Sequence, residues 1–191
     1  MRPAHDRQRL EALFEDVWIE VSHIESRFTL LRVMFHDRTT ARVLEQTAPM
    51  TFRALGAALT EAVLLAVHRL LQPGAQRGRR TASVETLLSH LPPDAARLRR
   101  ELQKALSTIR DECSDVSDLR HRHIAHRDYS VALEEVDTPR VKAHSITAAI
   151  DGFARILTEI SERCGLNLPY EPGEIHLDVE QLITRLTSGS R

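Results

Sequence analysis

The sequence predicts an all-α protein, a single-domain antiparallel helical bundle with additional short helices. Apolar residues recur three and four positions apart along most of the 191 residues, which is the spacing of a helix with one buried face. With 7 glycines and 8 prolines, few residues interrupt these stripes, and short connections between them are typical of a bundle. Alternation at period two is confined to residues 129–136, which could form a short extended stretch.

Three helical segments are expected in the N-terminal part. The first begins near Asp6, reaches the late twenties, and carries one apolar stripe: Leu10, Leu13, Phe14, Val17, Trp18, Val21 and Ile24. Helical character continues through residues 28–46 in one or two pieces, with a break near residues 37–40. A strongly apolar helix then begins at Pro49 and ends before Pro73-Gly74, because proline and glycine together cannot continue it. We expect this third segment to be the central core helix.

Two further helices are expected in the middle of the chain. An arginine-containing loop at residues 74–80 leads to Thr81 or Ser83, either of which can cap a short helix over residues 84–90. Pro93 is well placed to begin a long helix. Its apolar stripe consists of Leu98, Leu102, Ala105, Leu106, Ile109 and Cys113.

The pattern continues towards the C-terminus with one short and one long helix. Residues 119–127 are expected to form a further helical turn or two, capped by Ser117 or Asp118. Pro139 opens a long helix that ends at Cys164-Gly165.

The last part of the chain is expected to be an appendage. A Pro/Gly-rich link at residues 166–173 leads to a short helix over residues 178–186. We therefore divide the chain into a helical bundle at residues 1–165 and a C-terminal link with a short helix at residues 166–191.

Composition and charge exclude several classes of protein. The net charge of −1 lacks the strongly basic signature of a duplex-DNA binder, although residues 77–127 carry 11 Arg/Lys against 7 Asp/Glu. Cys113 and Cys164 show no CxxC spacing, so reduced thiols in a cytosol are expected. The N-terminus offers no apolar segment for secretion, and the longest apolar run, Ala54 to Val67, is too short to span a bilayer. A cytoplasmic protein without a membrane segment is expected.

The most unusual stretch lies between Asp118 and Asp128. It reads Asp118-Leu-Arg-His-Arg-His-Ile-Ala-His-Arg-Asp128, with three histidines and three arginines from Arg120 to Arg127. Imidazole titrates near neutral pH, and a guanidinium can grip two phosphate oxygens. The stretch is therefore a candidate site for chemistry on a phosphodiester.

This stretch resembles the motif of the HEPN superfamily, R-x4-6-H with a polar residue after the arginine. Arg120-His121 followed by His126 fits that motif. The stretch is also similar to R-N-K-R-I-A-H-x-D, the motif of the AbiU-like abortive-infection branch. It departs at His121, where asparagine is common, and at His123, where arginine or lysine is common, and both residues remain polar.

The resemblance extends upstream and carries functional implications. Residues 69–73 and 81–88 resemble the R-L-x-D-P turn and the S-L-x-x-L helix of the same branch. The resemblance implies a HEPN-like helical bundle that forms a homodimer, with two motifs meeting across one cleft. It also implies a metal-independent endoribonuclease of prokaryotic antiphage or toxin–antitoxin type. Arg120 and His126 would be catalytic, and His121 and Arg122 would support them.

Such a site needs few parts, because RNA carries its own nucleophile. The 2′-OH lies next to the scissile phosphate, so cleavage requires alignment, a proton-transfer group and positive charge where the phosphorane develops. A histidine with a pKa of about 6.5 can move the proton, and an arginine can hold the phosphate. No metal and no cofactor are required. The products would be a 2′,3′-cyclic phosphate and a 5′-hydroxyl, and DNA would be resistant.

Helical geometry leaves two arginines as candidates. At about 100° per residue, Arg120 and His126 lie about 120° apart around a continuous helix, whereas Arg122 and His126 share a face. Either Arg122 is the working partner, or a bend brings Arg120 to the histidine.

Other interpretations of the same residues remain open. His126 could cap a helix end, and Arg120 or Arg122 could pair with Asp115, Asp118 or Asp128. The three histidines of the stretch do not share one helical side, which disfavours a metal site. The protein could be a non-catalytic HEPN module that binds RNA, nucleotide or a protein partner such as an antitoxin or defence-system component. It could also be a purely structural interaction domain, since a fold does not define a function.

Overall fold

The structure is a computed structural model of the 191-residue chain, and it describes residues 2–76, 79–119, 141–167 and 175–188. Within these residues the fold is all-α, as the sequence predicts, apart from one two-stranded hairpin. The described chain divides into two compact units. Unit 1 contains Met1–Val21 and Leu64–Tyr170, and unit 2 contains Ser22–Val63 and Glu171–Arg191.

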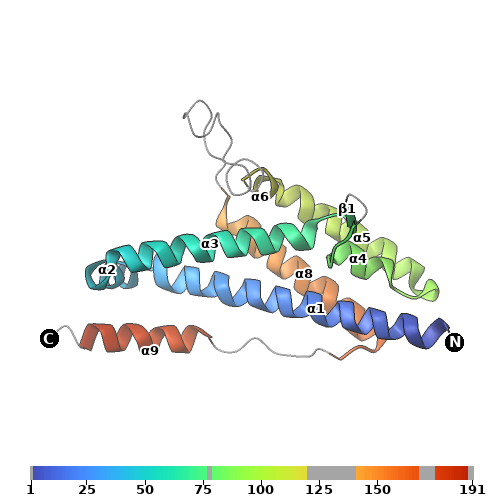
Figure 1. Ribbon diagram of the computed structural model, residues 1–191, viewed down its shortest axis with the longest axis horizontal. Coiled ribbons are helices and arrows are strands. Elements are labelled where there is room, and N and C mark those ends of the chain that lie inside the picture. Colours follow the sequence, from blue (N-terminus) through green and yellow to red (C-terminus); the bar gives the residue numbers. More distant parts are fainter. Residues whose placement is uncertain (1, 77–78, 120–140, 168–174, 189–191) are drawn as a thin grey trace. The chain divides into compact units, whose positions relative to one another are not determined.

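Unit 1 is a helical bundle that also contains a short hairpin (Figure 1). It contains residues 2–21 of α1 (Arg2–Leu31), residues 64–71 of α3 (Pro49–Leu71), β1 (Ala75–Gln76), β2 (Arg79–Arg80), α4 (Val84–Ser89), the 3₁₀ turn η2 (Pro93–Ala95), α5 (Ala96–Glu112), α6 (Ser114–Leu119) and α8 (Ala143–Cys164). The strands pair antiparallel, with Ala75 opposite Arg80. The predicted arginine-containing loop is therefore the hairpin, and its Arg77 lies outside the described residues.

Capping residues set the helix ends as the sequence predicts. Ser83 is the N-cap of α4, and its Oγ accepts a hydrogen bond from the Thr86 backbone N–H at 3.3 Å. Gly165 follows α8 with a left-handed backbone, at φ 60°, a conformation that glycine adopts without steric cost. Leu71 ends α3 directly before Gln72-Pro73-Gly74.

Two predicted boundaries are wrong. Helix α6 begins at Ser114, so Ser117 lies inside it and does not cap a helix that starts at Leu119. Helix α8 begins at Ala143 with Lys142 as its N-cap residue, so Val141 precedes the helix. The predicted start at Pro139 lies outside the described residues.

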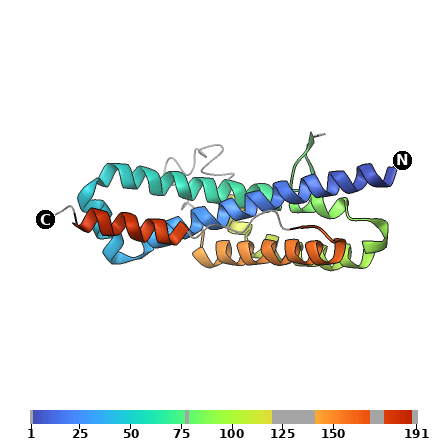
Figure 2. The same ribbon diagram turned by 90° about the horizontal axis from the view of Figure 1, so that it is seen from below.

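The pairing of α5 with α8 forms the main part of the unit 1 core, and Figure 2 shows the two helices side by side. Each presents a buried apolar stripe: Leu98, Leu102, Leu106 and Ile109 from α5, and Ile146, Ala149, Ile150, Phe153, Ile156, Leu157 and Ile160 from α8. Burying a side chain of this size contributes about 1.5–3 kcal/mol. This interface therefore holds α8, which follows residues 120–140, against α5, which precedes α6.

Gly152 permits a close approach of α8 to α5. A Cβ at this position would lie 2.5 Å from Ile109 Cδ1 and 2.8 Å from Ile109 Cγ1. We expect Gly152→Ala to destabilise the protein by about 1–3 kcal/mol, because overpacking outweighs the better helix propensity of alanine. Urea unfolding followed by circular dichroism measures the change.

The control for this prediction removes the clash. Ile109→Ala alone should cost about 2–5 kcal/mol, since it empties a buried site. In that background Gly152→Ala should cost nothing further or stabilise by up to about 1 kcal/mol. If Gly152→Ala lowers the free energy of unfolding equally in the wild type and in Ile109→Ala, then Ile109 is not the residue that limits the space at Gly152.

Unit 2 has its own small core. It contains residues 22–31 of α1, the π-helix η1 (Arg32–His36), α2 (Arg38–Thr47), residues 49–63 of α3 and α9 (Ile175–Ser188). The predicted break near residues 37–40 is confirmed, since Asp37 is the N-cap of α2 and its Oδ1 accepts from the Thr40 N–H at 2.7 Å. This hydrogen bond lowers the pKa of the Asp37 carboxyl.

The core of unit 2 is small. Met34 and Leu44 are buried, and partly buried apolar residues pack against them: Leu30, Val33, Phe35, Phe52, Ile183 and Leu186.

Helix α3 is the predicted core helix over only part of its length. Val63–Leu71 is mostly buried, whereas residues 49–62 are half-buried or exposed, and Met50 is 76% exposed. The helix has 23 residues and a mean hydropathy of 1.5 in its most apolar window, of which 39% is buried. By length and composition alone it is long and apolar enough to cross a membrane, a test that core helices of soluble proteins also pass.

Candidate functional site

The predicted site residues lie in one segment of unit 1, between α6 and α8. Arg120, His121, Arg122 and His126 all fall within residues 120–140, outside the described residues. Whether Arg120 or Arg122 is the partner of His126 therefore stays a prediction. The described residues on both sides show which parts of unit 1 precede and follow the segment.

Two hydrogen bonds join the chain before this segment to the chain after it. Cys113, directly before α6, donates from Sγ to the Ser145 carbonyl oxygen at 3.3 Å. Asp115 Oδ2 accepts from the Lys142 backbone N–H, also at 3.3 Å. Cys113 and Ser145 are 1% and 3% exposed, so their hydrogen bond is shielded from water. The first turn of α6 is thus fixed beside the first turn of α8 (Figure 1).

Helix α6 is held at its centre as well. Val116 is fully buried, and the backbone N–H of Val116 donates to Asp115 Oδ1 at 2.9 Å. These contacts hold the described part of this helix, Ser114–Leu119, in place.

A buried histidine on α3 contacts α6 just before the motif. His68 is 7% exposed, and its Nδ1 lies 3.3 Å from Ser117 Oγ. Ser117 precedes Arg120 by three residues. No local sequence pattern indicates this role for His68, because the contact joins residues 49 positions apart.

Arg110 stabilises the end of α3 that carries His68. Arg110 Nε donates to the Leu71 carbonyl oxygen at 2.8 Å, and Nη2 donates to the Gln72 carbonyl oxygen at 3.3 Å. Arg110 also forms an ion pair with Glu85 of α4. These bonds satisfy carbonyl groups that a helix end otherwise leaves without partners.

The surroundings of both thiols in unit 1 favour the protonated form. Burial, followed by the charges of Asp115 and Glu112, raises the pKa of Cys113 to about 11. Burial also raises the pKa of Cys164. Both cysteines are free, as expected, and both are protonated near neutral pH. Cys113 acts here as a hydrogen-bond donor.

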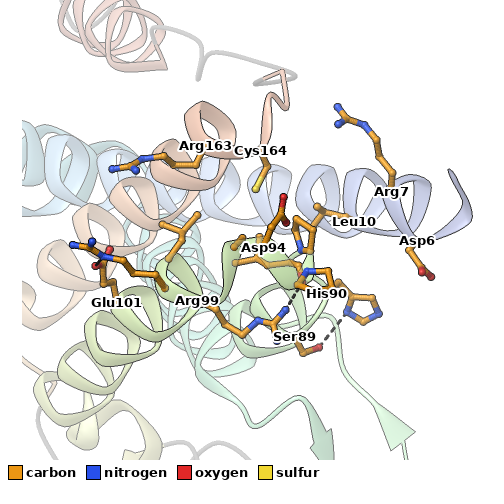
Figure 3. Close-up of a pocket in the computed structure, with 16 residues that line it drawn as sticks. Asp6, Arg7, Leu10, Ser89, His90, Asp94, Arg99, Glu101, Arg163 and Cys164 are labelled. Carbon is orange, nitrogen blue, oxygen red and sulfur yellow. Dashed lines mark hydrogen bonds and ion pairs between the residues drawn. The ribbon is translucent and has the colours of Figure 1, made fainter. Parts of the chain in front are cut away.

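A separate pocket of about 1130 Å³ opens between the first turns of α1, the α4–α5 connection and the end of α8 (Figure 3). Its charged side chains are largely paired with one another or with neighbours. Arg7 donates to Glu11 at 2.8 Å, Arg97 donates to Glu101 at 2.9 Å, and Arg99 donates to the Leu91 carbonyl oxygen. Such exposed pairs are typical of a solvated surface.

The pocket also contains His90, whose Nδ1 lies 2.9 Å from the Thr86 carbonyl oxygen and therefore carries the proton. The pocket lies at the Cys164 end of α8, whereas the motif precedes the Ala143 end. The two ends of this 22-residue helix lie about 30 Å apart. In the described part of the chain, no three His, Cys, Asp or Glu residues cluster to hold a metal ion.

The all-α fold and the sequence motif between α6 and α8 are those expected of the HEPN class. The family model HEPN_AbiU2, described as AbiU2, matches residues 7–181, and the chain belongs to this family. This match confirms the family expected from the sequence. No curated protein matches the chain, and no solved structure matches it.

Proposed function

We propose that this protein is a metal-independent endoribonuclease of antiphage or toxin type, with Arg120 and His126 as its catalytic pair. His121 and Arg122 support that pair. The observation that carries the proposal is the Arg120–His126 motif in a chain of the HEPN AbiU2 family. RNA is the substrate, and an antitoxin or another defence protein is the expected partner in the cytoplasm.

The flanking structure supports the proposal on physical grounds. A catalytic pair that relies on positioning needs a rigid support. The hydrogen bonds Cys113–Ser145 and Asp115–Lys142 supply one on both sides of the motif. His126 takes the proton from the 2′-OH, and the 2′-oxygen forms a bond to phosphorus while the bond from phosphorus to the 5′-oxygen breaks. The imidazolium then gives the proton to the 5′-oxygen, which leaves as a 5′-hydroxyl. The arginine stabilises the charge that builds up on the phosphate oxygens.

The test is cleavage of RNA in the absence of free metal. Prokaryotic total RNA should be cut by the purified protein at an unchanged rate in excess EDTA, because side chains perform the proton transfer and the charge stabilisation. The products should carry 2′,3′-cyclic phosphate and 5′-hydroxyl ends. A site made resistant by a single 2′-deoxy substitution would identify the 2′-OH as the nucleophile.

Two outcomes would contradict this proposal. Loss of cleavage in EDTA with recovery on adding a divalent ion would show that the mechanism uses a metal. Absence of cleavage by the folded protein would favour the alternative, a non-catalytic HEPN module that binds RNA, nucleotide or a protein. RNA that binds without being cut would distinguish that alternative from a structural interaction domain.

The proposal also includes a homodimer, since a symmetric interface can bring two motifs to one cleft. The interface is expected to contain residues 120–128. Light scattering at micromolar concentration should give about twice the 21.7 kDa of one chain. A monomer with full activity would contradict this arrangement.

A further inference from the structure

We propose that His68 is a positioning residue for the Arg120–His126 site and that it acts through Ser117. This inference rests on the proposed function. His68 is assigned no contact with RNA; it sets the direction in which α6 leads into the motif.

The first argument is that an imidazole is a costly residue at this place. The neighbouring residues of α3 form a dry apolar surface: Ala66 and Val67 at 0%, Leu70 at 1% and Leu71 at 6% exposed. A leucine would bury more apolar area here, whereas a buried imidazole requires hydrogen-bond partners. A buried polar contact of this kind specifies one arrangement of the packed elements more strongly than apolar packing does.

The second argument is the place of the contact on α6. The Cys113 and Asp115 hydrogen bonds fix the first turn of this helix, and Val116 anchors its apolar side. Ser117 lies beyond all three anchors, and its contact with His68 Nδ1 fixes the rotation of the last turn. Arg120 follows Ser117 by three residues, so the direction of this turn sets the point from which the motif segment begins.

The third argument is that the histidine itself is held rigidly. Arg110 binds the two carbonyl groups at the end of α3, and Arg69 forms an ion pair with Glu20 of α1. His68 therefore belongs to a fixed part of unit 1 and can act as a reference point for α6. A misplacement of about 1 Å in a catalytic group can cost on the order of 10²-fold in rate.

The experiment compares RNA cleavage by His68→Leu, Ser117→Ala, the double variant and His68→Asn. The two single variants should each lower kcat by roughly 10- to 100-fold with little change in KM, because the groups that act in the transition state are displaced. The double variant should be no slower than the slower single variant, since each substitution already removes the His68–Ser117 contact. His68→Asn places an amide near the former Nδ1 and should recover activity to within about threefold of the wild type.

The control is Val67→Ala, a change on the same helix that costs stability without removing a polar contact to α6. It should leave kcat unchanged at a temperature where all variants are folded. If Val67→Ala lowers kcat as much as His68→Leu does, or if His68→Leu leaves kcat unchanged, the inference is overturned.

A second measurement does not depend on RNA cleavage. Hydrogen exchange of the backbone amides in residues 114–119 should be faster in His68→Leu than in the wild type and near the wild-type rate in His68→Asn. Unchanged exchange in His68→Leu overturns the inference even if the enzyme is active. If the wild type cleaves no RNA, the proposed function fails, and faster exchange still supports the His68–Ser117 link.

Discussion

His126→Ala is expected to slow RNA cleavage by roughly 10²-fold or more, the usual scale for loss of a general acid–base group. The substitution removes the group that accepts the 2′-OH proton, so kcat should fall more than KM rises. The melting temperature should change little, because the residue is assigned a role in the transition state and not in packing. Cleavage of one labelled RNA under single-turnover conditions measures the effect on the chemical step.

The chain offers a matched control in the same stretch. His123 stands two residues after His121 and three before His126, and the proposal assigns it no role. His123→Ala should therefore keep most of the activity. If both alanine variants are equally slow, loss of local structure explains the result better than loss of a proton acceptor. If neither is slow in a folded protein, His126 is not catalytic.

Helix ends with local chemical causes were predictable from the sequence. Pro49 and Leu71 bound α3, Ser83 caps α4, and Gly165 follows α8. In each case the cause lies within a few residues of the effect: a missing N–H, a hydroxyl that replaces a backbone partner, or a left-handed backbone. The fold class follows from the same local patterns.

The start of α6 was missed because its sequence, Ser114-Asp-Val-Ser-Asp-Leu119, is polar. These residue types favour caps and turns, since their side chains compete for backbone hydrogen bonds. A weak signal was present, as Cys113 and Val116 are three residues apart and both are buried. Tertiary contacts to Ser145 and Lys142, which no local pattern shows, stabilise this helix.

The exposure of residues 49–62 and the contact of His68 could not be predicted for a similar reason. An apolar stripe shows that a face can be buried, but it does not show what covers that face. His68 occupies one position in an apolar helix, and its partner Ser117 is close only in the folded protein. The motif itself was identifiable because its chemistry lies within seven consecutive residues, Arg120 to His126.

Arg120→Ala is expected to lower cleavage on the same scale as His126→Ala, roughly 10²-fold, and Arg120→Lys should restore little of it. A guanidinium can donate two parallel hydrogen bonds to phosphate oxygens, whereas an ammonium is a single point charge. Arg122→Ala and Arg122→Lys, measured on the same RNA, provide the comparison.

Comparing the Arg120 and Arg122 variants distinguishes two assignments of the working arginine. The family motif assigns Arg120, whereas the geometry of a continuous helix favours Arg122. In a straight helix Arg122 lies one turn before His126 and on the same face, whereas Arg120 is about 120° away. If Arg120→Ala is the more damaging change, the family motif assigns the arginine correctly, and Arg120 acts either through a bend in its own segment or across the dimer cleft. If Arg122→Ala is the more damaging change, a continuous helix suffices, and Arg122 holds the phosphate. Equal and small effects of both variants in a folded protein would contradict a catalytic arginine here and favour the binding module. The result therefore decides which of the two arginines acts in the reaction.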